Sequence, residues 1–336
     1  MALNYPRLDN ASGIWTMKEV EEAVKGGYWP NAGARGLFGG GSTPSDVNTI
    51  DYITLSSAGD AADFGDLAMG NTTQGGGAAA NFVRCMWGGG QVSPARKDNI
   101  DYVTIMTTGN AADFGDLTQD TNQPSTASNA VRGVFQGGKD SSPGDINTKV
   151  DYVQMQSLGN AIDFGDLSGA RAQGAGVASP TRMLIGGGVA PSVTNIMEYI
   201  TIATTGNHQD FGNLTAAKAN LAGVDSSTRG AFGGGYTPTH LDVIEYVEIA
   251  STGNGIDYGD LSATRNEPGR SSNSVRGIFG GGQTPTRVDI IEFISIASGG
   301  AVTDFGNLTS ARSMTNGNSN CHGGLNDGNQ GVVNTS

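Results

Sequence analysis

The stretch that decides the fold is Arg276-Gly-Ile-Phe-Gly-Gly-Gly282, which is followed by Glu292-Phe-Ile and then by Asp304-Phe-Gly-Asn-Leu308. This three-part motif occurs six times along the chain of 336 residues. Its last aspartate recurs at intervals of 50, 50, 47, 47 and 47 residues, at Asp63, Asp113, Asp163, Asp210, Asp257 and Asp304. A repeat of this length indicates one small supersecondary unit that buries its faces only by packing against copies of itself.

Each repeat has the pattern of four short strands, named a to d in chain order. In the fifth repeat these are Leu221–Val224, Arg229–Gly233, Val243–Ala250 and Ile256–Leu261, separated by turn-forming residues. Six such units predict an all-β, six-bladed β-propeller of four-stranded antiparallel blades, because ring closure hides most sheet edges. A solenoid is the alternative, but it needs polar capping repeats at both ends, and the C-terminus has none.

The two ends of the repeat array predict how the ring closes. The first repeat has strands b, c and d at Arg35–Gly39, Thr49–Leu55 and Ala62–Leu67, but only Gly27-Tyr-Trp-Pro-Asn31 stands before them. Arg312–Asn320 resembles the start of a seventh repeat that then stops. We therefore predict that Arg312–Asn320 supplies the missing strand a. In the alternative, Tyr28-Trp29 fills that position.

The chain divides into an attachment segment at residues 1–34, a propeller at 35–324 and a tail at 325–336. Thr16-Met-Lys-Glu19 has the spacing of a capping box, and Gly26-Gly27 ends the short amphipathic helix that it begins. The helix is too short to be stable alone, so it packs on its own propeller or on a neighbour. Its aromatic anchors are Trp15, Tyr28 and Trp29.

Composition excludes several function classes. A net charge of −13 argues against nucleic acid and anionic membrane as partners. No apolar stretch approaches the roughly 20 residues of a membrane span. The N-terminus lacks the features of a signal peptide, which predicts synthesis in a cytoplasm without Sec-type export. Cys85 and Cys321 are interpreted as two free thiols.

Charged residues also recur with the repeat. Six arginines begin strand b, and six acids lie in strand c, each between apolar neighbours that indicate burial. We expect bidentate pairs between these arginines and acids, joining adjacent strands or blades. Sixfold repetition favours a structural role, because catalysis needs one asymmetric arrangement. The arginines are Arg35, Arg84, Arg132, Arg182, Arg229 and Arg276, and the acids are Asp51, Asp101, Asp151, Glu198, Glu245 and Glu292.

No motif for catalysis, metal or cofactor stands out. The Gly-Gly-Gly runs have no following Lys-Ser/Thr or helix and so are not phosphate loops. The Gly-Asn-Ala-x-Asp-Phe-Gly-Asp-Leu segments indicate Asx-turns and strand caps and lack the ligand spacing of a calcium loop. His208, His240 and His322 lie in different repeats. We expect no catalytic residues, no metal and no cofactor.

Length variation indicates where binding occurs. It is confined to the b–c and d–a connections, which leave a four-stranded antiparallel blade at the same end, so one rim of the ring carries all of it. The alternative is that these loops are solvated and simply tolerate insertion. As candidate binding residues the rim presents Arg96, Lys97, Lys139, Tyr236, His240 and Arg287.

The repeat resembles the kelch motif. An apolar strand ends in Gly-Gly, and a strand like Ile244-Glu-Tyr-Val247 follows. An aromatic residue then precedes Ala-Arg at Arg171 and Arg312, and Ala-Thr-Arg at Arg265. The chain departs from kelch in replacing the usual tryptophan by Phe or Tyr, and in lacking Ala-Arg after the first two repeats. Kelch enzymes that oxidise sugars use a copper site of Tyr, His and Cys, which has no counterpart that we can place here.

A second resemblance concerns the leader. Ser12-Gly-Ile-Trp-Thr-Met-Lys-Glu-Val20, with Tyr28-Trp-Pro30, resembles a segment of tail-fibre-like proteins of tailed marine and cyanobacterial bacteriophages. It implies a non-enzymatic virion protein of the tail or capsid, made in the host cytoplasm, with other virion proteins in a symmetric assembly and a host surface glycan as partners. The alternative is a carbohydrate-binding kelch propeller of cellular origin, for which Tyr236 is the one rim aromatic.

Overall fold

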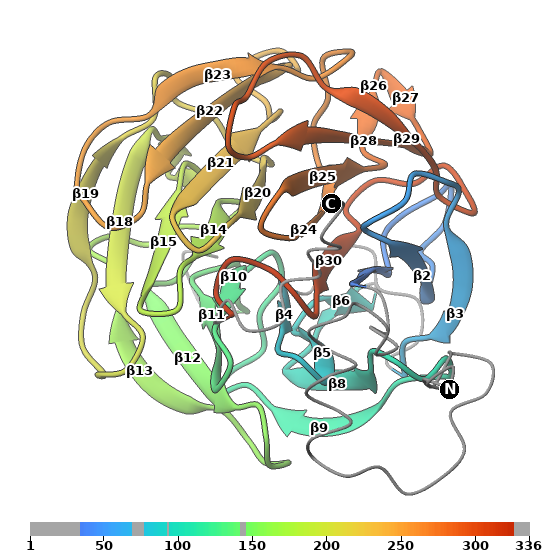
Figure 1. Ribbon diagram of the computed structural model, residues 1–336. Coiled ribbons are helices and arrows are strands. Elements are labelled where there is room, and N and C mark those ends of the chain that lie inside the picture. The colour runs from blue at the N-terminus through green and yellow to red at the C-terminus, as the bar shows by residue number, and fades with distance from the viewer. Residues whose placement is uncertain (1–33, 69–76, 93, 142–145, 326–336) are drawn as a thin grey trace, which may run out of the picture.

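The computed structural model of the protein describes residues 34–68, 77–92, 94–141 and 146–325. These residues form six four-stranded antiparallel sheets arranged as blades around a central axis (Figure 1). The all-β six-bladed propeller expected from the repeat is therefore confirmed. The solenoid alternative is wrong, because the sixth blade packs against the first.

Every blade has the same strand order from axis to circumference. The innermost strands a are, from blade 1 to blade 6, β30 (Asn316–Ser319), β4 (Gly77–Ala80), β10 (Ser125–Ser128), β14 (Ala175–Ala178), β20 (Ala222–Asp225) and β24 (Gly269–Ser272). Strands b are β1 (Arg35–Gly39), β5 (Arg84–Gly88), β11 (Arg132–Gln136), β15 (Arg182–Gly186), β21 (Arg229–Gly233) and β25 (Arg276–Gly280). Strands c are β2 (Thr49–Thr54), β8 (Asn99–Thr104), β12 (Lys149–Gln154), β18 (Ile196–Thr201), β22 (Val243–Glu248) and β28 (Ile290–Ser295). The outermost strands d are β3 (Ala62–Asp66), β9 (Ala112–Asp116), β13 (Ile162–Asp166), β19 (Gln209–Asn213), β23 (Ile256–Asp260) and β29 (Thr303–Asn307).

The ring is closed by the last strand of the chain. β30 pairs antiparallel with β1, with Gly36 opposite Ser319 and Gly39 opposite Asn316. The prediction that Arg312–Asn320 supplies the strand a of blade 1 is thus confirmed. The alternative that Tyr28-Trp29 fills this position is wrong, since β30 occupies it.

The attachment segment lies outside the described residues. Its helix and its anchors Trp15, Tyr28 and Trp29 therefore stay predictions, as does the tail beyond Leu325. Among the residues that the structure describes, no helix is long and apolar enough to cross a membrane.

Aromatic residues of strand b join neighbouring blades. Phe38 of blade 1 lies over Gly280 of blade 6, where an added Cβ would come within 3.0 Å of the ring. Trp87 of blade 2 packs in the same way over Gly39. In the five blades whose strand b ends in glycine, that glycine makes room for the aromatic ring of the next blade. In blade 3 strand b ends in Gln136, and blade 4 has Ile185 in place of the ring. This contact explains why the repeat carries an aromatic residue directly before glycine.

The repeated Asp-Phe-Gly-Asp segment forms a second junction at the circumference. The amides of Gly109 and Ala111 in blade 2 donate to the carbonyls of Phe64 and Asp66 in blade 1, each at 2.8 Å. Asn110 Oδ1 accepts the amide of Asp66 at 3.1 Å. The same pattern closes the ring, where the Gly59 amide donates to Phe305. The segment is therefore an inter-blade junction as well as a set of caps.

The predicted pairing of strand b arginines with strand c acids is wrong, because of strand register. Arg35 lies opposite Thr54, whereas Asp51 lies opposite Phe38. The two charges are therefore three residues apart along the strand, or about 10 Å. Each strand b arginine instead lies over an aromatic ring of its own strand c, as Arg35 lies 4.8 Å from the Tyr52 centroid, and donates to a carbonyl of the next blade.

The buried acids pair with cations from the d–a connections. Four ion pairs recur at the blade junctions, and their side chains are almost fully buried. They are Arg171–Glu198 at 3.1 Å, Lys218–Glu245 at 2.5 Å, Arg265–Glu292 at 2.9 Å and Arg312–Asp51 at 3.1 Å. In blade 3, Thr118 holds Asp151 through its amide and hydroxyl, at 2.8 and 2.9 Å. Burial raises the pKa of the Asp151 carboxyl despite these bonds. The predicted structural role of the acids fits this geometry.

We predict that Gly306→Ala weakens the junction between blades 6 and 1. Gly306 has φ of +146°, and an added Cβ would lie 2.4 Å from the Gly59 carbonyl oxygen. Strain and overpacking of this kind cost about 1–3 kcal/mol. The urea midpoint of unfolding measures the loss. Gly59→Ala is the matched control, because no atom lies within 4 Å of its added Cβ. Equal midpoints for the two variants would contradict the junction.

A second prediction concerns the buried ion pairs. Arg265→Met leaves Glu292 buried without its cation and should cost about 3–5 kcal/mol. The double variant Arg265→Met/Glu292→Leu should recover most of that loss, because two apolar groups replace the pair. Denaturant unfolding of both variants tests this. A double variant as unstable as the single one would show that packing, rather than the unpaired charge, sets the cost.

Candidate binding face

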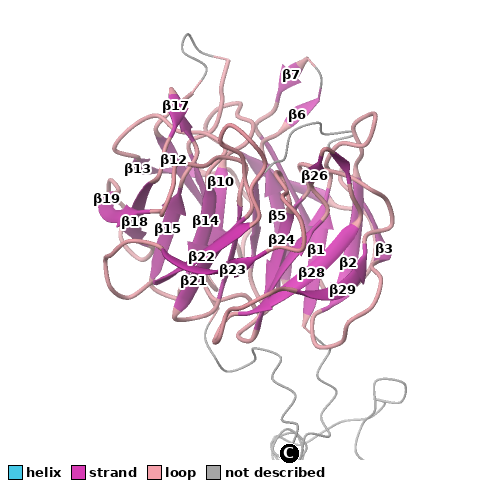
Figure 2. Ribbon diagram, turned by 90° about the horizontal axis from the view of Figure 1, so that it is seen from above, coloured by secondary structure: helices cyan, strands magenta, loops and turns pink. Residues whose placement is uncertain are grey.

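The two faces of the ring differ sharply. The b–c connections of three blades form small hairpins, which stand together on one face (Figure 2). They consist of β6 (Gln91–Val92) with β7 (Ala95–Arg96), β16 (Val189–Ala190) with β17 (Ser192–Val193), and β26 (Gln283–Thr284) with β27 (Thr286–Arg287). We call this the hairpin face. The described chain begins at Ala34 and ends at Leu325 on the opposite face, since β1 starts beside the end of β30.

A guanidinium fills the centre of the channel. The second residue of strand a faces the axis and is small in five blades, as at Gly176 and Gly223, but in blade 6 it is Arg270. Its Nη atoms donate to four backbone carbonyls, one from the strand a of each of four other blades. These carbonyls belong to Gly176, Gly223, Ala78 and Thr126. Burial lowers the pKa of Arg270, and Asp225 partly offsets this. Arg270 thus has a structural role: it supplies hydrogen-bond donors to buried carbonyls that point at the axis.

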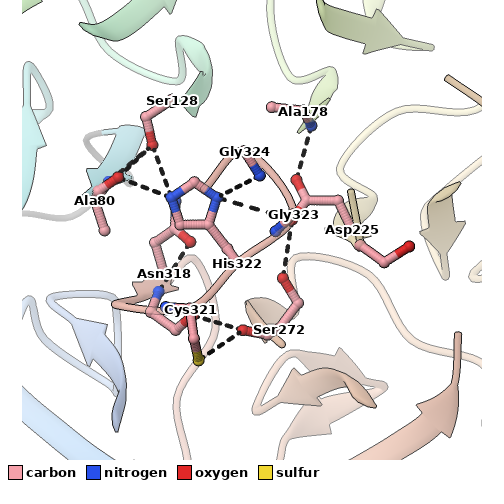
Figure 3. A network of polar contacts seen from close by, with 12 residues as sticks. Ala80, Ser128, Ala178, Asp225, Ser272, Asn318, Cys321, His322, Gly323 and Gly324 are labelled. Carbon is pink, nitrogen blue, oxygen red and sulfur yellow. Dashed lines mark hydrogen bonds and ion pairs between the residues drawn. The ribbon is translucent and has the colours of Figure 1, made fainter. Parts of the chain in front are cut away.

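Residues 321–325 follow β30 and lie in the channel on the side opposite the hairpins. Figure 3 shows the polar contacts that hold them. His322 is buried, its Nε2 lies 2.8 Å from the Ala80 carbonyl, and its Nδ1 accepts the Gly324 amide at 3.1 Å. Because a carbonyl only accepts, the proton is on Nε2. Asp225 accepts the amides of Ala178 and Gly323, both at 2.8 Å.

This network contains a serine, a histidine and an aspartate, but their geometry does not suit catalysis. A catalytic triad needs Nε2 free to take the serine proton and Nδ1 protonated toward the aspartate. Here the tautomer is the reverse, and Ser128 and His322 are both at most 1% exposed. Because both side chains are buried, the network suits a structural role: it holds residues 321–324 in the channel.

On the hairpin face the axis opens into a pocket above Arg270. The pocket provides about 70 Å³, room for about two waters at the roughly 30 Å³ that each occupies in the liquid. Around its mouth, the residue two positions before strand a has a left-handed backbone in blade 1 and in blades 3 to 6, with φ between 55° and 62°. Amide-to-carbonyl hydrogen bonds of 2.8–3.2 Å link these residues in a collar. The collar consists of Gln123, Gln173, Asn220, Glu267 and Met314.

The collar can bind a small polar group. Gln123, Gln173 and Asn220 supply amides, and burial raises the pKa of the Glu267 carboxyl. Non-glycine residues in this conformation cost about 1–3 kcal/mol each and gather at binding sites. The pocket sits beneath the hairpins, so a ligand held by the hairpin face could place one polar group in it.

The structure places all six predicted rim residues on the hairpin face, but in different roles. Arg96 donates to the Asp140 carbonyl of the next blade, and Arg287 donates to Ser42 Oγ of blade 1 at 3.0 Å. Lys139 pairs through its backbone with Asn122, and the Lys97 carbonyl accepts the Thr121 amide at 3.0 Å. These four residues tie connections together.

Tyr236 is the exposed residue of the set, and the partly buried His240 packs against it. Their rings meet at 5.8 Å between centroids in an edge-on arrangement, and Tyr236 is 39% exposed. Sequence reasoning missed Arg270 and the collar, because strands a consist of small residues whose neighbours across the axis belong to other repeats. Aligning the repeats would have revealed Arg270 as the one large residue at a position of Gly, Ala or Thr.

The comparisons with known proteins leave the fold as the firm result. No protein-family model matches the chain, and no curated protein matches it either. Within the described residues, no three His, Cys, Asp or Glu side chains are arranged to hold a metal ion.

Two buried histidines predict a pH dependence. Burial lowers the pKa of His208 to about 4 and also lowers the pKa of His322. Below about pH 6.5 these histidines bind protons in the unfolded chain but not in the folded chain. Their contribution to the free energy of unfolding is therefore fully present above that pH and is lost as the pH decreases. The loss is at most about 1.4 kcal/mol per pH unit for each histidine. For His208 the loss continues to about pH 4.

The double variant His208→Asn/His322→Asn should lose less stability than the wild type between pH 7 and pH 5. Denaturant unfolding at both pH values measures the difference, and taking the difference cancels the carboxylates common to both proteins. Parallel pH profiles would show that neither histidine is held neutral in the folded state.

Proposed function

We propose that the protein is a non-enzymatic structural component of a bacteriophage virion, part of the tail or a decoration of the capsid. In this proposal its kelch-type propeller docks neighbouring virion proteins in a symmetric assembly and presents its hairpin face to the host surface. The fold itself is suited to binding proteins or glycans, and the finer assignment depends on three supports.

The observation that carries the proposal is the separation of the two faces. The described chain begins at Ala34 and ends at Leu325 on one face, and the hairpins and axial pocket lie on the other. A module held through its ends presents the opposite face outward, with connections of variable length where binding loops belong. The arrangement suits an attached protein whose free face meets a partner.

The leader supplies the second support. Ser12–Val20 and Tyr28-Trp-Pro30 resemble a segment of phage tail-fibre-like proteins. With Trp15, Tyr28 and Trp29, the leader offers aromatic anchors of the kind that dominate protein–protein contacts.

The third support is that side chains capable of acid–base or nucleophilic chemistry have structural contacts in this fold. His322, Ser128 and Asp225 close the channel, and the strand c acids join blades, so the repeated charged residues have structural partners. A carbohydrate-binding propeller of cellular origin is the second candidate. Tyr236, which is 39% exposed and packs against His240, favours it, because the electron-rich face of an exposed aromatic ring can attract the C–H groups of a sugar.

We predict that antibodies against the hairpin connections label intact virions purified from infected cells. Antibodies against a buried strand such as β21 should label only denatured protein. Negative-stain imaging would give the location on tail or capsid. Particles free of label, with the protein confined to the soluble fraction of the host, would instead support the cellular candidate.

A further inference from the structure

A groove lies between the b–c hairpins of blades 5 and 6, away from the axial pocket. Tyr236 and His240 form one wall, and Thr284 and Pro285 of blade 6 form the other. Thr264, which follows strand β23, completes the lining from the d–a connection. The groove is shallow and open to solvent, with about 570 Å³ of space above its lining residues.

The aromatic wall is held rigidly. Tyr236 and His240 form a β-bridge with each other, and the amide of Tyr236 also donates to the Ala219 carbonyl at 2.8 Å. The Thr237 amide donates to the Thr239 carbonyl at 2.9 Å, which tightens the turn. A wall fixed before binding loses little conformational entropy when a ligand arrives.

The lining contains no Asp, Glu, Lys or Arg. It offers an aromatic face, two prolines, and the hydroxyls of Thr239, Thr264 and Thr284. Hydroxyls both donate and accept hydrogen bonds, while the electron-rich face of Tyr236 attracts C–H groups. A flat ring with apolar C–H groups on one face and hydroxyls at its edge matches both features.

We propose that this groove binds the terminal residue of an uncharged glycan. The sugar ring stacks on Tyr236, and its hydroxyls bond to the threonines and to His240. An anionic sugar would find no Lys or Arg in the lining to pair with, and the net charge of −13 would repel it. The proposal deepens the proposed function and rests on it only in taking the hairpin face as the binding face.

Blade 6 provides a natural control for the aromatic pair. Its hairpin, Gln283-Thr-Pro-Thr-Arg287, matches Tyr236-Thr-Pro-Thr-His240 except that Gln and Arg replace the two rings. The backbone pairing is equivalent, with Gln283 opposite Arg287 and bridged to Asn266. Tyr236→Gln/His240→Arg therefore copies into blade 5 a hairpin that already folds in this chain.

The experiment applies the full-length protein to an array of uncharged, sialylated and uronic acid-containing glycans, followed by titration of the glycans that bind. We expect binding to uncharged glycans. Affinity should fall at least about tenfold in Tyr236→Gln/His240→Arg and stay within about threefold in Tyr236→Phe, which keeps the stacking face. Circular dichroism confirms that each variant is folded.

Three results would overturn the groove: no uncharged glycan bound, preference for acidic glycans, or affinity unchanged in Tyr236→Gln/His240→Arg. The antibody labelling of virions is independent of all three. If the protein is found on virions but binds no glycan, the glycan-binding proposal alone is wrong. If the protein binds uncharged glycans but is absent from virions, the virion assignment is wrong and the glycan-binding proposal stands.

Discussion

The structure depends on hydrogen bonds and ion pairs between blades, made at three distances from the axis. At the circumference, the c–d turn of one blade pairs with the outer strand of the previous one. At intermediate distance, a cation from each of four d–a connections meets a strand c acid. At the axis, the collar joins neighbouring connections. Because no blade buries its faces alone, the contacts at each of these three distances form only when the blades pack together, and so they form together.

Symmetry is broken where the channel must be filled. Six identical inner strands would leave a hole lined by carbonyls, and small residues along strands a keep the hole narrow without closing it. Arg270 fills one level. Asp225 and His322 fill the next level of the channel, where they accept the amides of Gly323 and Gly324 respectively. The departures from the repeat are therefore packing solutions, and they confine the accessible part of the channel to the hairpin face.

The sequence predicts much of the fold because two signals agree. Alternating apolar residues set the strands, and the fixed period sets the blades, so observed strands such as β21 and β22 begin at the predicted residues. The unfinished repeat near Arg312 predicts the closing strand. The partners of the acids could not be predicted, because a register offset of three residues separates Asp51 from Arg35 within one blade. For the site, the rim was predictable from loop length and Tyr236 from its chemistry. The collar was not, because it exists only once the ring is closed.

Closure by β30 has a consequence for how the chain folds as it is made. β1 leaves the ribosome early, but its inner partner follows 283 residues later, counting from Gly36 to Ser319. At about 5–20 residues per second this takes roughly 15–60 s. Throughout that interval one edge of β1 is unpaired, and unpaired edges recruit other chains. Nascent copies on one polysome would thus be exposed to strand exchange until translation reaches the final blade.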